Sequence, residues 1–485
     1  MAKEITVEEY SAVQKQIAGY VERARIAQAE LATYDQRRVD ELAAAIVYTL
    51  SRPAFAQKVG ELVMEETQMG ALQSKIGKLT GLPRYLHYYK SWPTVGVIER
   101  IPEKGLVKMV KPIGVVGCVC PSTNPEGTPA FNALMCIRAR NACIVGAHKK
   151  SYKSTKMVVD AVRAVMKANG APEDFMICVE NPTIDTSKEV MRQCDLTFAT
   201  GAQPMVRSAY SSGKPAIGVG AGNCISVIDK EVDMDRASTN VVLGKSAGDR
   251  AAGCSTEQSV AVQASIYDEF LKLLQLKGGY LCNEQEKEQL VNTVWPGGTI
   301  SHDIIAKPVE YIAEKCGITI PEGTRFLMVE DSTDHVGPEY PLCKEKLSLI
   351  LTVYKYDAFE DAIDLVNRCH NVVGKGHSCN IQSTNDDNIL KFALETFTCR
   401  VSANMPNGLS NGGAPWNGLN PTFSIGCGTW GGNSVSENVH QYHYMNQSVL
   451  HFPVCEMKDA IIPTDADAFG DLLTNVQVYE DASLI

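Results

Sequence analysis

One cysteine of this chain has neighbours unlike those of the others. The chain has 16 cysteines, and most lie inside apolar runs, as Cys136 and Cys178 do, where a thiol packs like a small hydrophobic side chain. Cys254 lies between small residues, in GDRAAGCSTEQSV. A reactive thiol needs room for a substrate and hydrogen-bond donors for the oxyanion that forms when it attacks a carbonyl group. Cys254 is therefore the candidate nucleophile, and core packing is the alternative.

Two glycine-containing turns have spacings that suit a nucleotide. Gly426, Gly428 and Gly431 match the dinucleotide fingerprint and follow the strand-like TFSI. No amphipathic helix opens at the third glycine, as that fingerprint requires, so we expect a glycine-rich loop that borders a pocket. Thr200 and Gly201 follow the apolar run LTFA and come directly before a helix. Backbone amides at such a helix start form an anion site that suits a pyrophosphate.

Short apolar strands and helices alternate from residue 107 onward and would position these residues. Strands are expected at 113–120, 142–147, 175–179, 196–199, 217–220 and 225–229. Helices are expected between them, which predicts right-handed βαβ units and a doubly wound parallel sheet. A second α/β block follows, with strands at 257–263, 348–356, 379–382 and 399–404 and a helix from Tyr267. The two blocks predict an α/β fold with a Rossmann-like domain and a second α/β domain.

Two amphipathic helices are expected in the first fifty residues, the second capped by Asp35. An amphipathic helix at this place either docks on a partner or shell or packs on its own domain.

Length and composition limit the classes that remain. A chain of 485 residues predicts two or three domains, and we expect boundaries that give 1–240, 241–430 and 431–485. The net charge of −10 speaks against nucleic acid or acidic lipid as a partner. No apolar stretch reaches the ~18 residues of a membrane span. The cysteines form no Cys-x-x-Cys, so we expect a reducing, cytoplasmic location and no metal site.

Four longer runs carry a family resemblance. They are NPEGTPAFNALMCIRARNACIVGAH, ATGAQPMVRSAYSSGKPAIGVGAGN, CSTEQSV and IGCGTWGGNSVSEN. In this order and spacing they resemble the CoA-acylating branch of the aldehyde dehydrogenase superfamily, including the aldehyde half of bifunctional aldehyde–alcohol dehydrogenases. The similarity covers roughly residues 20 to 445. It implies a nicotinamide-binding domain, a catalytic domain and an oligomerisation element.

The resemblance implies roles for three residues in the chemistry. Cys254 occupies the position of the thiolate that attacks the aldehyde, and Asn124 that of the asparagine that stabilises the thiohemiacetal oxyanion together with the Cys254 N–H group. Hydride transfer to a nicotinamide then leaves a thioester, from which CoA takes the acyl group. His377 matches a histidine of the acylating branch. It either assists proton transfer from CoA or only supports the site.

One missing carboxylate favours acyl transfer to CoA over hydrolysis. Hydrolytic relatives have a glutamate that activates water in the segment that is Ile217-Gly-Val-Gly-Ala-Gly222 here. Without such a base the thioester persists until a stronger nucleophile arrives, and a thiol is one.

The resemblance also implies a nicotinamide dinucleotide as cofactor. Glu345 matches the glutamate that binds the nicotinamide ribose, and Thr200, Gly201 and Gly220 belong to the same cofactor-binding set. The residues that would face the adenosine ribose are His148, Lys149 and Lys150. Two lysines there favour NADP over NAD, because cations form charge-assisted hydrogen bonds with a 2′-phosphate. A solvated basic turn is the alternative.

Arg250 departs from the family pattern and bears on the substrate. Acylating relatives usually read Asp-Asn-Gly-(Val/Ile)-Ile-Cys before the nucleophile, whereas this chain reads Asp249-Arg-Ala-Ala-Gly-Cys254. A cation in a dry pocket is costly unless it is paired. We therefore predict a short anionic aldehyde, sulfoacetaldehyde first and succinate semialdehyde second, over acetaldehyde. The alternative is that Arg250 pairs with Asp249 or with a neighbouring subunit.

Taken with the resemblance, the sequence predicts a cytoplasmic, homodimeric or homotetrameric CoA-acylating aldehyde dehydrogenase. A hydrolytic aldehyde dehydrogenase is the rival among enzymes. An inactive subunit associated with a microcompartment shell is the rival from another class.

Overall fold

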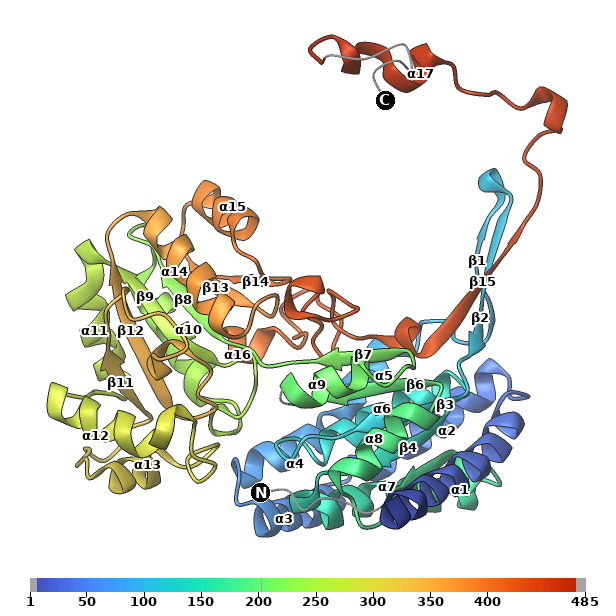
Figure 1. Cartoon of the computed structure of the whole chain (residues 1–485), viewed down its shortest axis with the longest axis horizontal. Helices are drawn as coiled ribbons and strands as arrows, with labels where there is room; N and C mark the ends of the chain where they lie inside the picture. Colours follow the sequence, from blue (N-terminus) through green and yellow to red (C-terminus); the bar gives the residue numbers. More distant parts are fainter. Residues whose placement is uncertain (1–6, 202, 477–485) are drawn as a thin grey trace.

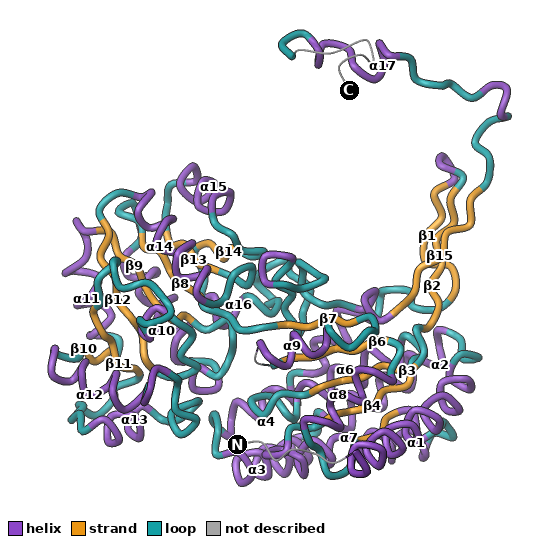
Figure 2. Tube along the Cα trace, viewed as in Figure 1, coloured by secondary structure: helices purple, strands orange, loops and turns teal. Residues whose placement is uncertain are grey.

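The computed structural model describes residues 7–201 and 203–476. Two helix-flanked parallel sheets form two lobes that lie side by side, and a small antiparallel sheet projects from the first lobe (Figures 1 and 2). No helix among the described residues is long and apolar enough to cross a membrane.

The first lobe is built on a five-stranded sheet in the order β5-β4-β3-β6-β7, with all pairs parallel. Its strands are β3 (Val115–Val119), β4 (Ala142–Gly146), β5 (Met176–Cys178), β6 (Leu196–Thr200) and β7 (Ala216–Val219). Its helices are α1 (Val7–Leu31), α2 (Gln36–Leu50), α3 (Pro53–Thr67), α4 (Leu72–Thr80), α5 (Leu82–Tyr89), α6 (Gly127–Arg138), α7 (Tyr152–Ala168), α8 (Ile184–Gln193) and α9 (Gln203–Tyr210).

Alternating residues of this sheet face two separate apolar layers. Val116 and Cys118 pack into the cluster that includes α2, α6 and α7, whereas Val115 packs with α1 and α8. Side chains along a strand alternate between its faces, so both faces are covered by helices. The predicted doubly wound parallel sheet is confirmed.

The two N-terminal helices pack on their own lobe. Asp35 accepts a hydrogen bond from Arg38 N and caps α2 as predicted. On α1, Ile17, Val21 and Ala24 are buried against the sheet. The interpretation that this helix packs on its own domain is confirmed.

The second lobe is built on a seven-stranded sheet in the order β10-β11-β12-β9-β8-β13-β14, with all pairs parallel. Its strands are β8 (Cys224–Ile228), β9 (Glu257–Gln263), β10 (Gly279–Leu281), β11 (Phe326–Glu330), β12 (Ile350–Tyr356), β13 (Cys379–Gln382) and β14 (Val401–Ala403). Its helices are α10 (Met234–Ser246), α11 (Tyr267–Leu276), α12 (Glu284–Val294), α13 (Val309–Cys316), α14 (Phe359–Val372), α15 (Asp386–Glu395) and α16 (Asn407–Ser410).

The placement of β8 corrects the sequence interpretation. The run at 225–229 was expected to close the first sheet, inside the domain 1–240, but β8 pairs with β9 and β13 of the second sheet. The chain therefore changes sheet between Val219 and Cys224. An apolar run shows that a strand is buried but not which neighbours it pairs with.

Three strands far apart in the sequence form the projecting sheet. β1 (Gly96–Ile101) and β15 (Met445–His451) pair antiparallel with the two edges of β2 (Leu106–Pro112). The described residues after β15, 452–476, are all exposed, and they include the short helix α17 (Asp465–Phe469). Figure 1 shows this segment running away from both lobes.

Candidate active site

Four neighbouring strands of the second sheet bring the predicted catalytic residues together. Glu345, Cys254, Gly222 and His377 directly precede β12, β9, β8 and β13, which are consecutive in the sheet. The amino ends of parallel strands meet at one edge, so residues up to 155 positions apart converge there. The site thus faces the segment through which the chain crosses from β7 of the first sheet to β8 of the second.

His377 contacts Cys254 directly. Its Nε2 lies 3.1 Å from Cys254 Sγ, and its Nδ1 lies 2.9 Å from Ser378 Oγ. Burial lowers the pKa of His377 to about 3, with Arg400 and His370 adding to the effect. The imidazole is therefore neutral at physiological pH.

Cys254 is partly buried, and its thiol is protonated at rest. Burial raises the pKa of Cys254 to about 12, with smaller contributions from the nearby Glu345 and Cys427. Gly222 is required beside it, because a Cβ there would lie 1.9 Å from the Cys254 carbonyl oxygen. Gly222, the last residue of the segment that lacks a carboxylate, therefore lies directly against the candidate nucleophile.

Asn124 lies in the turn between β3 and α6, and the oxygen of its side-chain amide lacks a hydrogen-bond partner within the described chain. Its Oδ1 is buried and has no hydrogen-bond partner among the described residues. Among the residues that the structure describes, no hydrogen bond joins Asn124 to Cys254. A Cβ on Gly127 would lie 2.6 Å from Asn124 Oδ1, so Gly127 leaves the amide its space.

A buried ionic cluster ties the Asn124 turn to the turn before Cys254. Lys75 Nζ and Lys78 Nζ lie 2.6 and 2.8 Å from Asp249 Oδ2. Both ammonium groups also donate to the carbonyl oxygen of Thr123, at 2.9 and 3.2 Å. Lys78 also pairs with the buried Glu126 at 3.2 Å. These contacts fix α4, the Asn124 turn and the approach to the nucleophile relative to one another.

The turn before Cys254 has an unusual backbone. Asp249, Arg250 and Ala251 all have positive φ, at 45°, 55° and 61°. Each such non-glycine residue costs on the order of 1 kcal/mol or more, so the surrounding contacts must stabilise the turn. Asp249 supplies them, since its Oδ1 also accepts a hydrogen bond from Ala71 N at 2.9 Å.

The residues implied for a nicotinamide dinucleotide come from both sheets: Gly220 follows β7 of the first sheet, and Glu345 precedes β12 of the second. Glu345 accepts a hydrogen bond from Gly222 N at 3.0 Å, and its other oxygen has no partner among the described residues. Burial raises the pKa of this carboxyl to about 8. Gly220 lies against the start of α9, since a Cβ there would be 3.0 Å from Gln203 Oε1. The open carboxylate oxygen beside the nucleophile fits a ribose hydroxyl.

The glycine-rich loop borders this site, as predicted. No α-helix opens at Gly431: a 3-10 turn, Thr429–Gly431, ends there, and the next α-helix of the described chain is α17. Arg400 donates to the carbonyl oxygens of His377, at 2.8 Å, and Gly426. A Cβ on Gly376 would lie 1.9 Å from the Cys427 carbonyl oxygen. The loop therefore forms a wall of the site beside Cys254 and His377.

The basic turn after β4 is exposed, and an acidic side chain, Glu66, lies close to it. His148, Lys149 and Lys150 are exposed on it. The carboxylate of Glu66 accepts hydrogen bonds from Lys153 N and Ser154 N, each at 2.8 Å, at the start of α7. A phosphate at this place would thus meet the lysines and a carboxylate together.

Arg250 has no partner in the described chain. It is half-buried and makes no hydrogen bond or ion pair there, and Asp249 is already engaged by Lys75 and Lys78. The predicted alternative of an Arg250–Asp249 pair is therefore wrong. Burial lowers the pKa of Lys307; the nearby Asp303 opposes this effect, and the positive charges of Arg250 and Lys150 add to it.

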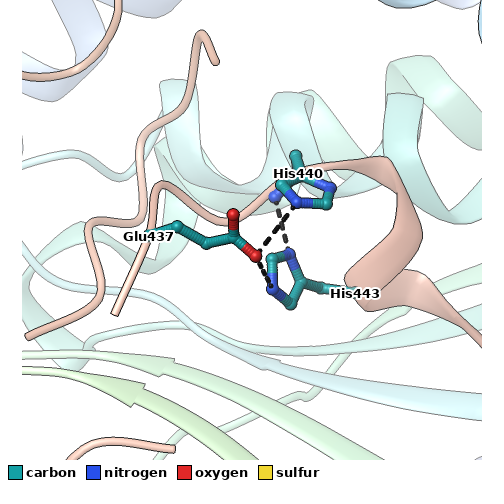
Figure 3. A group of neighbouring side chains, drawn as sticks. All are labelled: Glu437, His440 and His443. Carbon is teal, nitrogen blue, oxygen red and sulfur yellow. Dashed lines mark hydrogen bonds and ion pairs between the residues drawn. The ribbon is translucent and has the colours of Figure 1, made fainter. Parts of the chain in front are cut away.

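A second cluster of titratable groups lies where the glycine-rich loop leads to β15. Glu437 Oε1 lies 3.2 Å from His440 Nε2 and 3.3 Å from His443 Nε2 (Figure 3). Nδ1 of each histidine accepts a backbone N–H, from Tyr442 and from His440. The ring protons therefore lie on Nε2 and point at the carboxylate. Metal binding through Nε2 would break both backbone bonds, so the arrangement is a hydrogen-bonded triad.

Fold and site together define a class of protein. A parallel sheet of the nucleotide-binding type faces a second α/β domain, which presents a thiol, an imidazole and an open carboxyl oxygen. The segment at the thiol has no carboxylate that could activate water. This is the arrangement of a thiol-dependent dehydrogenase.

Comparison with known proteins gives the family. Residues 2–315 match the Aldehyde dehydrogenase family. The chain is 36% identical over 466 residues to an acylating sulfoacetaldehyde dehydrogenase of Bilophila wadsworthia, covering 94% of this chain and 98% of that protein. It is also 36% identical over 455 residues to an acetylating succinate-semialdehyde dehydrogenase of Clostridium kluyveri, covering 93% and 98%. The crystal structure of an acetylating aldehyde dehydrogenase from Geobacillus thermoglucosidasius has a TM-score of 0.88 at 30% identity, covering 93% of this chain and 99% of that one.

The chain belongs to the aldehyde dehydrogenase family, in its acylating branch.

Several residues of the site were not predicted from the sequence. They are Lys75, Lys78, Glu126, Ser378, Arg400 and Asn407. A signal existed for the two lysines, which lie three positions apart in LQSKIGKLT and so share one face of a short helix. The others are polar residues in loops or, for Asn407, at the start of α16, and only their contacts reveal them.

Proposed function

We propose that the protein catalyses the reversible reaction aldehyde + CoA + NAD(P)⁺ ⇌ acyl-CoA + NAD(P)H + H⁺. The Cys254 thiol first loses its proton to water; the thiolate then bonds to the aldehyde carbon, and the carbonyl oxygen takes the electron pair as an oxyanion. Asn124 Nδ2 and the Cys254 N–H group donate to that oxyanion. A nicotinamide held at Glu345 would supply the hydride acceptor, and loss of the hydride would convert the adduct on Cys254 into a thioester. The CoA thiol then displaces Cys254 from the acyl carbon.

The observation that supports acyl transfer over hydrolysis is the composition of the segment at the nucleophile. Residues 217–222 end at Gly222, which lies against Cys254, and they contain no carboxylate. Of the nearby acids, Glu345 is bonded to Gly222 N. Glu257 accepts hydrogen bonds from the backbone of Asn407 and Gly408. Both oxygens of Glu257 are thus engaged, whereas Glu345 keeps one open oxygen; neither residue belongs to the segment 217–222, where hydrolytic relatives have their base.

Omitting CoA tests this function. Without CoA, the purified protein should form about one equivalent of NAD(P)H per Cys254 and then slow, because the thioester accumulates. With CoA, turnover should continue and acyl-CoA should appear. Free acid formed at full rate without CoA would show a hydrolytic enzyme instead, and inactivity under both conditions would favour the inactive subunit. The packing of α1 on its own lobe removes the N-terminal helix as the docking element of that last alternative.

We further propose that the aldehyde is short and anionic, sulfoacetaldehyde first and succinate semialdehyde second. The half-buried Arg250 guanidinium lacks a counterion in the described chain, and guanidinium suits sulfonate and carboxylate oxygens. Ala252 and Gly253 leave more room beside the nucleophile than the larger residues of relatives do. The two relatives named for these substrates are equally similar, at 36% identity, so their similarity does not rank them.

Replacing Arg250 by asparagine should raise the KM for the anionic aldehyde by about tenfold or more, because a hydrogen bond to a charged group contributes roughly 1.5–3 kcal/mol. The kinetics with acetaldehyde should change little. Initial rates with both aldehydes measure this, with the exposed Arg236→Asn as a matched control. Equal responses to both aldehydes would make Arg250 structural and remove the substrate proposal.

NADP⁺ should be accepted and preferred over NAD⁺, because Lys149 and Lys150 can pair with a 2′-phosphate. Glu66 at the start of α7 opposes this preference. Replacing both lysines by alanine should raise the KM for NADP⁺ by about threefold or more and leave that for NAD⁺ unchanged, since exposed ion pairs contribute little. Lys272→Ala on α11 is the control. A kcat/KM for NAD⁺ more than about tenfold above that for NADP⁺ would refute the preference.

We also propose that the C-terminal part of the chain, 431–485, makes a homodimer or homotetramer. The exposed residues after β15 include many large apolar side chains, which water disfavours. They are Phe452, Val454, Met457, Ile461, Ile462, Phe469, Leu472, Leu473 and Val476. All 16 cysteines are free thiols, which supports a reducing location such as the cytoplasm.

Deleting residues 452–485 should lower the oligomeric state, because the truncated chain would no longer cover apolar surface of a second copy. Light scattering coupled to gel filtration measures the mass of both proteins. A full-length monomer, or an unchanged mass after truncation, would contradict the proposal.

A further inference from the structure

The contacts of Asn407 fix the direction of a chain of hydrogen bonds that ends at the nucleophile. Asn407 begins α16 and is fully buried. Its Nδ2 donates to the carbonyl oxygen of Ser255 at 2.7 Å and to Ser378 Oγ at 3.1 Å. Its Oδ1 accepts from Ser402 Oγ at 2.7 Å. Because a carbonyl oxygen can only accept, the amide nitrogen must face Ser255, and so it must donate to Ser378.

The hydroxyl hydrogen of Ser378 then has one possible acceptor among the described residues, His377 Nδ1. Ser378 is fully buried, and its Oγ contacts only Asn407 Nδ2 and His377 Nδ1 in the described chain. Asn407 is a donor, so the hydroxyl donates to His377 Nδ1. The opposite arrangement would leave a buried O–H group unsatisfied, which costs about 1–3 kcal/mol.

The tautomer of His377 follows from this contact. A neutral imidazole has one protonated nitrogen. If Nδ1 accepts from Ser378, the proton lies on Nε2, 3.1 Å from Cys254 Sγ. The other titratable groups around this pair are Glu345 and Cys427, which raise the pKa of Cys254, and Arg400 and His370, which keep His377 neutral.

We propose that Asn407 and Ser378 are positioning residues that hold His377 as a hydrogen-bond donor to the Cys254 thiolate, and not as the base that takes the thiol proton. The role of these residues in catalysis rests on the proposed function. When the CoA thiolate bonds to the acyl carbon, the C–S bond to Cys254 breaks and its electron pair returns to the sulfur. The His377 Nε2–H group stabilises that sulfur both as attacking nucleophile and as leaving group.

Alkylation of the free enzyme tests the inference without aldehyde, CoA or nicotinamide, so its outcome is independent of the overall reaction. The rate at which iodoacetamide modifies Cys254 is followed by peptide mass spectrometry across a range of pH. The exposed Cys455 is the internal control in every variant, and its rate should not change.

Two pairs of variants separate the roles. Ser378→Ala should slow alkylation of Cys254 at neutral pH by about tenfold and shift the pH profile upward, whereas Ser378→Thr, which keeps the hydroxyl, should stay within about threefold of the parent. His377→Gln keeps an N–H donor but is no base, so it should react at least about fivefold faster than His377→Leu. The second pair keeps the inference testable if Ser378→Ala does not fold.

Two results would overturn the proposal. An unchanged rate and pH profile in Ser378→Ala would show that Ser378 does not position His377. Equally slow alkylation in His377→Gln and His377→Leu would show that the imidazole acts as a base.

Discussion

The Cys254→Ala variant should lose kcat/KM by about four orders of magnitude or more, as removal of a nucleophile does in other enzymes with covalent intermediates. Alanine removes the sulfur that bonds to the aldehyde carbon. It leaves the backbone N–H group and the neighbouring Gly222 in place, so the fold should be retained. Steady-state rates of NAD(P)H formation and of the reverse reaction with acyl-CoA measure the loss.

Cys455→Ser is the matched control, because Cys455 is exposed after β15 and far in sequence from the site. Mass spectrometry of the parent after reaction with aldehyde and NAD(P)⁺, without CoA, should show an acyl group on the peptide that contains Cys254. Substantial activity in the alanine variant, or an acyl group on another cysteine such as Cys427, would assign the chemistry elsewhere.

The second large effect is expected at Asn124. Removing one donor from an oxyanion site costs on the order of 10²–10³-fold in kcat. Asn124→Ala should therefore lower kcat by about this factor with little change in the KM for the aldehyde, since the lost bond forms only after attack. The exposed Asn292→Ala on α12 is the control.

Alkylation of Cys254 by iodoacetamide distinguishes an oxyanion role from damage to the site. This reaction forms no carbonyl oxyanion, so Asn124→Ala should react with iodoacetamide at the parent rate. A parallel fall in alkylation and kcat would mean that Asn124 only supports the turn, whose Thr123 carbonyl oxygen accepts from Lys75 and Lys78. A kcat close to that of the parent would exclude the oxyanion role.

Local patterns were sufficient for most of the regular elements. The run 257–263 is the strand β9 with both predicted ends, and α11 begins at Tyr267 as expected. Such runs are short, apolar and bounded by small or polar residues, so burial alone determines their conformation. The helices between residues 53 and 89 and the strands β1 and β2 were not predicted. Their apolar residues are interrupted, and β1 and β2 lie in a sheet that β15 completes.

The candidate nucleophile could be selected from the sequence, because small neighbours distinguish Cys254 from cysteines in apolar runs. The family resemblance supplied Asn124, His377 and Glu345, but not how they meet. Only the tertiary structure placed His377, 123 positions from Cys254, within hydrogen-bonding distance of its sulfur.

The sequence by itself determined most strands of the two parallel sheets, distinguished Cys254 by its small neighbours, and showed that no carboxylate lies at 217–222. Strand pairing decided the rest: β8 joined the second sheet, and the amino ends of four parallel strands assembled the site. The partners of Asp249 and Asn407 were likewise set by contacts across more than 20 residues. Periodicity and composition are local properties, whereas pairing and hydrogen-bond direction depend on residues that only the folded chain brings together.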